Sequence, residues 1–141
     1  SSAMQIAGSM KNPEITSVQR ERAAHLQNNG LTFGYATFWN ANVVTELTDG
    51  DVEAVAVSID ANAQGQGVPH TSMWRQATAD RRMERPDEPV FLMLTAQESG
   101  QLSDFLALSG AQKRWEQSGM TIYEIESQRV FFETAQTMDA Q

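Results

Sequence analysis

The chain alternates between strand-like apolar runs and helix-like amphipathic segments. Residues 90–95, VFLMLT, are apolar at almost every position, and residues 52–59, VEAVAVSI, carry apolar side chains on both alternating faces. Such runs are typical of strands covered on both sides, as in a parallel sheet. Residues 31–36 have the pattern of a shorter core strand. Apolar residues at positions 38, 41, 44 and 47 then follow with helical spacing, up to a stop at Asp49-Gly50.

Start and stop signals place the other elements. Asn12-Pro13 and Asn29-Gly30 bracket a predicted helix over residues 13–28. Glycine, proline and amide side chains make residues 60–72 a predicted long surface loop, and residues 73–85 suggest an irregular helix. The remaining predicted elements are a helix capped by Ser99 and ending at Ser109-Gly110, a hairpin of residues 112–117 and 120–126, and one or two helical turns from Val130.

The order of these elements predicts the fold. Strands separated by helices pair in parallel through right-handed crossovers. We therefore expect an α/β fold, namely a three-layer Rossmann-like sandwich with a mostly parallel sheet and a C-terminal antiparallel hairpin at its edge. Residues 1–11 are expected to be an expression remnant and flexible lead-in. Residues 12–128 are expected to form a single α/β domain, and residues 129–141 a C-terminal tail with at most a short helix.

Composition narrows the classes of partner and cofactor. The 141 residues suffice for one domain with its own core. The formal charge of −8 disfavours nucleic acid and anionic membrane surfaces as partners. The absence of cysteine excludes disulfides, thiolate-bound zinc and thiol catalysis. Because His25 and His70 are far apart in the sequence and lie in no metal-binding motif, we expect neither a metal nor a cofactor.

The candidate site follows from a rule for open α/β sheets, in which ligands bind beyond the carboxyl ends of the parallel strands. Aromatic rings there can stack on a sugar or a base, and amides can make directional hydrogen bonds. The candidate ligand-binding residues are Tyr35, Thr37, Trp39 and Asn40 after the first strand, Asp60 after the second and Glu98 after the third.

A structural interpretation of the same residues competes with the functional one. Aromatic residues at helical spacing are usually buried in a core, and acids at strand ends or helix starts usually act as caps. We therefore expect no catalytic residue, although a general acid/base pair of Asp60 and Glu98 remains an alternative. No nucleophile elbow and no phosphate-binding loop occur in the chain.

Several of these features carry a family resemblance. The segment GLTFGYATFWNANVVTELTDGDVEAVAV, with the later MWRQATADRRMERPDEPVFLMLT, resembles the soluble C-terminal domain that follows the transmembrane helices in some bacterial multi-spanning glycosyltransferase-like membrane proteins. The matching features are Gly34-Tyr35-Ala36, the pair Phe38-Trp39 ahead of Asn40-Ala41, Trp74 and the FLML strand. They cover about residues 30–125.

This resemblance implies a non-catalytic domain, since the acid that transfers the sugar lies in the membrane-embedded part of such proteins. It also implies a location on the extracytoplasmic face of the bacterial cytoplasmic membrane. The implied partners are the parent transmembrane region and a sugar or lipid-linked sugar. Two alternatives stay open. One is a free-standing cytoplasmic enzyme that uses Asp60 and Glu98 beneath the loop of residues 60–72, and the other is a protein-interaction module.

Overall fold

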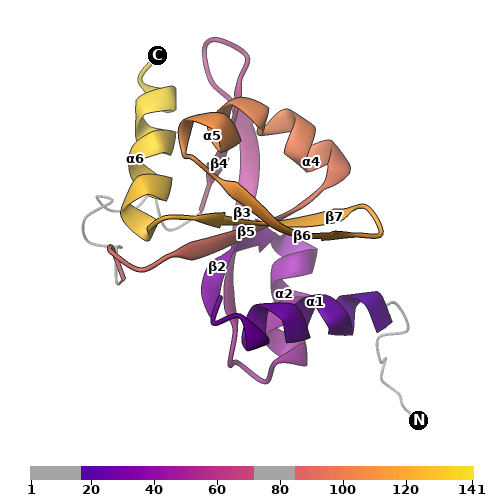
Figure 1. Cartoon of the computed structure of the whole chain (residues 1–141). Coiled ribbons are helices and arrows are strands. Elements are labelled where there is room, and N and C mark those ends of the chain that lie inside the picture. Colours follow the sequence, from indigo (N-terminus) through magenta and orange to yellow (C-terminus); the bar gives the residue numbers. More distant parts are fainter. Residues whose placement is uncertain (1–16, 72–84) are drawn as a thin grey trace.

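The computed structural model describes residues 17–71 and 85–141, and this part of the chain is built around one mixed sheet (Figure 1). Its strand order is β4-β3-β2-β5-β7-β6. The strands are β2 (Phe33–Thr37), β3 (Glu53–Ala61), β4 (Gly67–His70), β5 (Val90–Thr95), β6 (Gln112–Gln117) and β7 (Met120–Ile125). The helices are α1 (Ser17–Asn28), α2 (Phe38–Leu47), α4 (Ala96–Gln101), α5 (Ser103–Leu108) and α6 (Gln128–Asp139).

The pairing of the strands corrects the expected fold. Only β2 pairs in parallel, with β3 on one side and β5 on the other. The β3–β4, β5–β7 and β6–β7 pairs are antiparallel. The prediction of a Rossmann-like sandwich with a mostly parallel sheet is therefore wrong, and the fold is α/β with an open, mixed sheet. The chain departs from the Rossmann pattern because it turns straight back after β3, and because β7 rather than β6 pairs with β5.

The turn that follows β3 lies in the segment that the sequence predicts to be a long loop. Residues 67–70 form β4 there, in a hairpin with β3. The Asn62 side chain closes the turn, since its Oδ1 accepts hydrogen bonds from the backbone N–H groups of Gln64 (3.0 Å) and Gln66 (2.9 Å). Pro69 fits this strand because β4 is at the edge of the sheet, where a missing N–H donor is tolerated.

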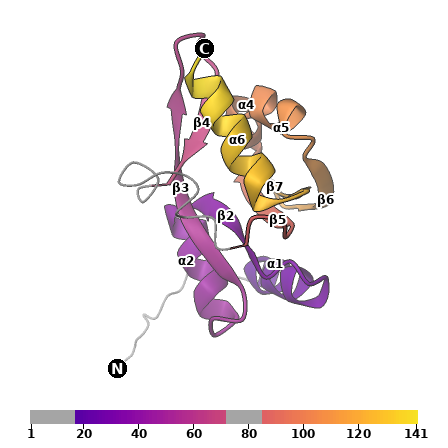
Figure 2. The same ribbon diagram turned by 90° about the vertical axis from the view of Figure 1, so that its left-hand side faces the viewer.

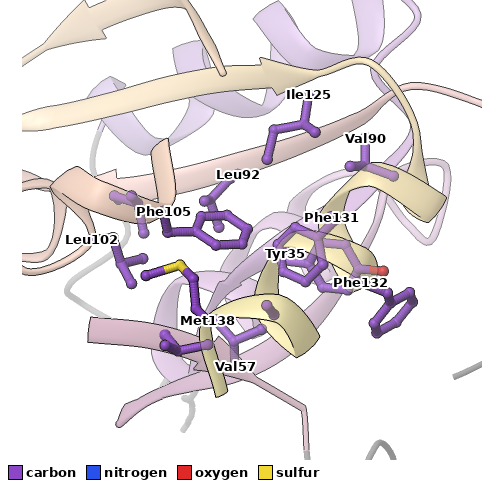
Figure 3. Close-up of a cluster of buried hydrophobic side chains, with 13 residues drawn as sticks. Tyr35, Val57, Val90, Leu92, Leu102, Phe105, Ile125, Phe131, Phe132 and Met138 are labelled. Atoms are coloured by element: carbon purple, nitrogen blue, oxygen red, sulfur yellow. The ribbon is translucent and has the colours of Figure 1, made fainter. Parts of the chain in front are cut away.

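The sheet is covered by helices on both faces. Along β5, Leu92 contributes to a core beneath α5 and α6, which we call the first core, whereas Phe91 and Met93 contribute to a second core beneath α1 and α2. This explains why the first five residues of the VFLMLT run are all apolar, and the prediction of a strand over residues 90–95 is confirmed. Figure 3 shows the first core. Its fully buried members include Tyr35, Leu92, Leu94, Leu102, Phe105, Ile125, Phe131 and Met138.

Helix α6 is longer than the sequence suggests. It is capped by Ser127, whose Oγ accepts a hydrogen bond from the Val130 N–H at 3.1 Å. Phe131, Ala135 and Met138 recur at helical spacing and are fully buried. Residues 129–139, for which we expected a tail with at most a short helix, thus lie in a 12-residue helix that packs on the core.

Two other elements compare differently with the sequence predictions. The C-terminal hairpin is confirmed over β6 and β7. The helix that was expected to be capped by Ser99 is instead capped four residues earlier by Thr95, begins at Ala96, and is divided into α4 and α5. Residues 73–84, for which an irregular helix was predicted, lie outside the described part of the chain. Among the described residues, no helix is both long enough and apolar enough to cross a bilayer.

Candidate functional site

Tyr35 lies in the core rather than at the surface. Only 1% of its surface is exposed, and its ring stacks on that of Phe131, with centroids 4.1 Å apart. Its hydroxyl accepts a hydrogen bond from Gln128 Nε2 at 3.2 Å. The phenol is thus held by packing and hydrogen bonding inside the protein. We therefore assign Tyr35 to the first core rather than to a ligand site.

Trp39, Thr37 and Asn40 stay together at the carboxyl end of β2. Thr37 ends the strand and precedes α2, and its Oγ1 accepts a hydrogen bond from Asn40 Nδ2 at 3.3 Å. Trp39 occupies the first turn of α2 and is 45% exposed. A tryptophan that exposes nearly half of its surface is available for contact with another molecule.

Asp60 and Glu98 have separate partners and do not form an acid/base pair in the described structure. Glu98 belongs to a capping box. Its carboxylate accepts a hydrogen bond from the Thr95 N–H at 2.9 Å, and Thr95 Oγ1 accepts one from the Glu98 N–H at 3.1 Å. Asp60 lies on the part of β3 that continues beyond β2, since Thr37 pairs with Val57 and the strand ends only at Ala61.

Asp60 instead belongs to a histidine cluster that joins β3, β4 and α6. His70 Nδ1 lies 2.8 Å from Asp60 Oδ2, and its Nε2 lies 2.7 Å from Asp139 Oδ2. The His70 side chain is 16% exposed, against 44% and 42% for the two carboxylates. Carboxylates only accept, so both ring nitrogens donate at the same time only in the imidazolium form. Figure 2 shows β4 running beside α6.

The geometry of this cluster is that of an anchor and not of a catalytic triad. Ser58 Oγ donates to Asp60 Oδ2 at 3.1 Å, and the Nε2 that would activate a serine is directed at Asp139. A second contact supports the anchor, because Asn62 Nδ2 donates to the Met138 carbonyl at 2.8 Å near the end of α6. The β3–β4 hairpin therefore holds the C-terminal turn of α6.

Metal binding finds no support in this cluster, because the two carboxylates contact opposite edges of the imidazole ring. Across residues 17–71 and 85–141, no group of three or more histidine and acidic side chains is arranged to hold a metal ion. Sequence reasoning did not identify Asp139, since it lies in the expected tail and 69 positions from His70. The pattern of the α6 helix was the only signal that could have placed it.

His25, on α1, is a partly buried histidine with a shifted pKa. Burial lowers its pKa below the ordinary value, because the imidazolium is less well solvated there. In the unfolded chain a histidine titrates near about pH 6.5. As the pH falls through that value, the unfolded chain takes up a proton before the folded protein does, so the free energy of unfolding decreases.

We expect His25→Gln to remove this contribution, so that the variant loses less stability than the parent between about pH 7 and pH 5. Urea unfolding at a series of pH values measures it. The difference in free energy of unfolding between parent and variant at each pH removes the contribution of the carboxylates that both proteins share. A difference that stays constant across this range would contradict the burial of the neutral ring.

Comparisons with known proteins add no assignment to these sites. No family model matches the chain, and no curated protein or solved structure is significantly similar to it.

Proposed function

We propose that this chain is a non-catalytic domain of a membrane glycosyltransferase-like protein, and that it contacts a sugar or lipid-linked sugar through Trp39. The exposure of Trp39 at the carboxyl end of β2 carries the proposal. The resemblance of residues 30–125 to the extracytoplasmic C-terminal domain of such proteins supports the choice of ligand and of location. The parent transmembrane region is the partner that this proposal requires.

The chemistry around Trp39 suits a sugar. The C–H face of a pyranose packs on an aromatic ring, while its hydroxyl groups need donors and acceptors at the edge of that ring. Thr37 and Asn40, which flank Trp39 in the chain, supply a hydroxyl and an amide and are linked to each other by a 3.3 Å hydrogen bond. The charge of −8 favours a neutral sugar over a sugar phosphate.

The two rival functions have weaker support. An enzyme that uses Asp60 and Glu98 as a pair requires the two carboxylates to lie close together. In the structure Asp60 is hydrogen-bonded to His70, and Glu98 is hydrogen-bonded to Thr95. An interaction module requires a contiguous apolar surface. Leu108, on α5, is 60% exposed, and the neighbouring surface depression is lined otherwise by Glu133, Thr134, Thr137 and Gln141. We therefore favour sugar binding at Trp39.

Trp39→Ala tests the proposal. We expect the variant to lose sugar binding while its free energy of unfolding changes by less than about 1 kcal/mol, because nearly half of the ring is exposed and little core packing is removed. Binding is measured first as a thermal shift against free sugars, sugar phosphates, nucleotide sugars and nucleotides. A ligand at a hundred times its dissociation constant adds about 2.7 kcal/mol of stability.

Leu108→Ala is the matched control, since it also removes a large exposed apolar side chain but from another helix. It should leave both the sugar-induced shift and the stability unchanged within about 0.5 kcal/mol. A loss of about 3–5 kcal/mol in Trp39→Ala would show that the indole belongs to the core, and the assignment of this site would then be withdrawn. A shift that survives Trp39→Ala would place the sugar elsewhere.

A further inference from the structure

A surface cavity lies at the end of β2 opposite to Trp39. It is a cavity of about 260 Å³ between the end of α1 and the β6–β7 hairpin. Its lining residues are His25, Asn29, Leu31, Arg114 and Glu124. Figures 1 and 2 place α1 on the face of the sheet opposite α6, next to this hairpin.

The strand register locates the cavity at the amino ends of the parallel strands. Glu124 pairs with Phe91 near the start of β5, and Phe91 pairs with Gly34 near the start of β2. Leu31 lies two residues before the start of β2. Trp39 follows the carboxyl end of β2, so the two places are at opposite ends of that strand.

A β-bulge in β6 brings charged groups to the cavity. Lys113 pairs with Tyr123 and Trp115 pairs with the adjacent Ile122, so Arg114 is an extra residue without a partner position on β7. Bulges redirect a side chain relative to the regular alternation of the strand. Here Arg114 Nε donates to Glu124 Oε1 at 2.9 Å, which holds the guanidinium and the carboxylate together at the wall of the cavity.

The lining residues retain unused hydrogen-bonding capacity. The bond between Arg114 and Glu124 uses one guanidinium nitrogen and one carboxylate oxygen. Asn29 Nδ2 donates to the His25 carbonyl at 2.8 Å and lies 3.4 Å from His25 Nδ1. Within the described part of the chain, no hydrogen bond uses the terminal nitrogens of Arg114, Glu124 Oε2, Asn29 Oδ1 or His25 Nε2. The cavity thus offers donors next to acceptors.

We propose that this cavity binds a neutral polyhydroxylated molecule of the size of one sugar unit. A hydroxyl group both donates and accepts, so a vicinal diol satisfies adjacent groups such as the Arg114 guanidinium and the Glu124 carboxylate simultaneously. The charges of Arg114 and Glu124 cancel each other. An anionic ligand is disfavoured because Glu124 repels it, and a cationic ligand is disfavoured because Arg114 repels it. The cavity volume accommodates one ring and not an oligosaccharide.

Leu31 adds an apolar side chain to the lining of the cavity. The Trp115 ring does not line the cavity but packs beside His25, with centroids 5.9 Å apart and an angle of 35° between the rings. The pKa of His25 is lowered by burial, so the ring is neutral at pH 7 and adds no charge to the lining. This proposal does not depend on Trp39 and holds whether or not the Trp39 surface binds a sugar.

Backbone ¹H–¹⁵N spectra of the chain test the proposal, with the methyl glycosides of glucose, galactose, mannose and arabinose as neutral probes. Glucuronate and glucosamine are the charged comparisons. We expect at least one neutral probe to shift amides within residues 25–31 and 112–124 in a saturable way. Glu124→Gln, which keeps the shape but removes the charge, should weaken that binding roughly tenfold.

Glu116→Gln is the matched control, since Glu116 pairs with Lys113 at 3.2 Å on the same hairpin but does not line the cavity. It should leave the dissociation constant unchanged. The proposal is overturned if no neutral probe shifts these amides, if both variants weaken binding equally, or if a charged probe binds more tightly than every neutral one. Trp39→Ala separates the two sites, because it should abolish shifts around residue 39 while those at the cavity persist.

Discussion

Phe131→Ala is expected to lower the free energy of unfolding by about 3–5 kcal/mol. The Phe131 ring lies in the first turn of α6 and is fully buried. It stacks on Tyr35 at 4.1 Å and meets Phe105 and Phe132 edge-on at 5.2 Å and 5.6 Å. Figure 3 shows these rings at the centre of the first core. Truncation would leave a cavity that the surrounding strands and helices can close only in part. Urea unfolding measures the loss.

The control for Phe131→Ala is again Leu108→Ala, in which the removed side chain is 60% exposed. It should change the stability by less than about 0.5 kcal/mol. A loss of less than about 1 kcal/mol in Phe131→Ala would mean that α6 contributes little to the core. The segment from residue 129 onward would then behave as the tail that the sequence suggests.

The local part of the fold could be predicted from the sequence. The spacing of apolar residues located α2, β5 and the β6–β7 hairpin, because each is determined by patterns within about a dozen residues. The order of the strands could not be predicted in this way. The β3–β4 hairpin is stabilised by the Asn62 side chain and by contacts with α6, including the bond from Asn62 to Met138, 76 positions away. A composition rich in glycine and amides does not reveal such long-range partners.

The same contrast between local patterns and long-range contacts applies to the candidate site. Thr37, Trp39 and Asn40 were expected to lie together and do so, because they are neighbours in the sequence. Asp60 and Glu98 were brought together only by assuming that their strands end at one edge. That assumption fails because β3 continues past β2 into its own hairpin. The cavity beside α1 was not expected at all, since its residues come from α1, the segment before β2, and the two strands of a hairpin.

Gly34 is a glycine whose role follows from packing between neighbouring strands. It lies inside β2, within the strand that the sequence predicts over residues 31–36, and is paired with Ala54 on one side and Phe91 on the other. A Cβ atom at this position would lie 2.3 Å from the Phe91 carbonyl oxygen and 2.4 Å from the Phe91 ring. The glycine therefore permits the close approach of β5 and its aromatic side chain.

Gly34→Ala is accordingly expected to destabilise the protein by about 3 kcal/mol, at the upper end of the usual range for overpacking, because the closest atom belongs to the backbone of a central strand. Gly100→Ala is the matched control, since Gly100 lies in α4 with no atom within 4 Å of the added Cβ. Alanine is favoured over glycine in a helix, so the control should gain about 0.5–1 kcal/mol. Opposite signs in urea unfolding would establish that space at β5, rather than backbone freedom, requires the glycine at position 34.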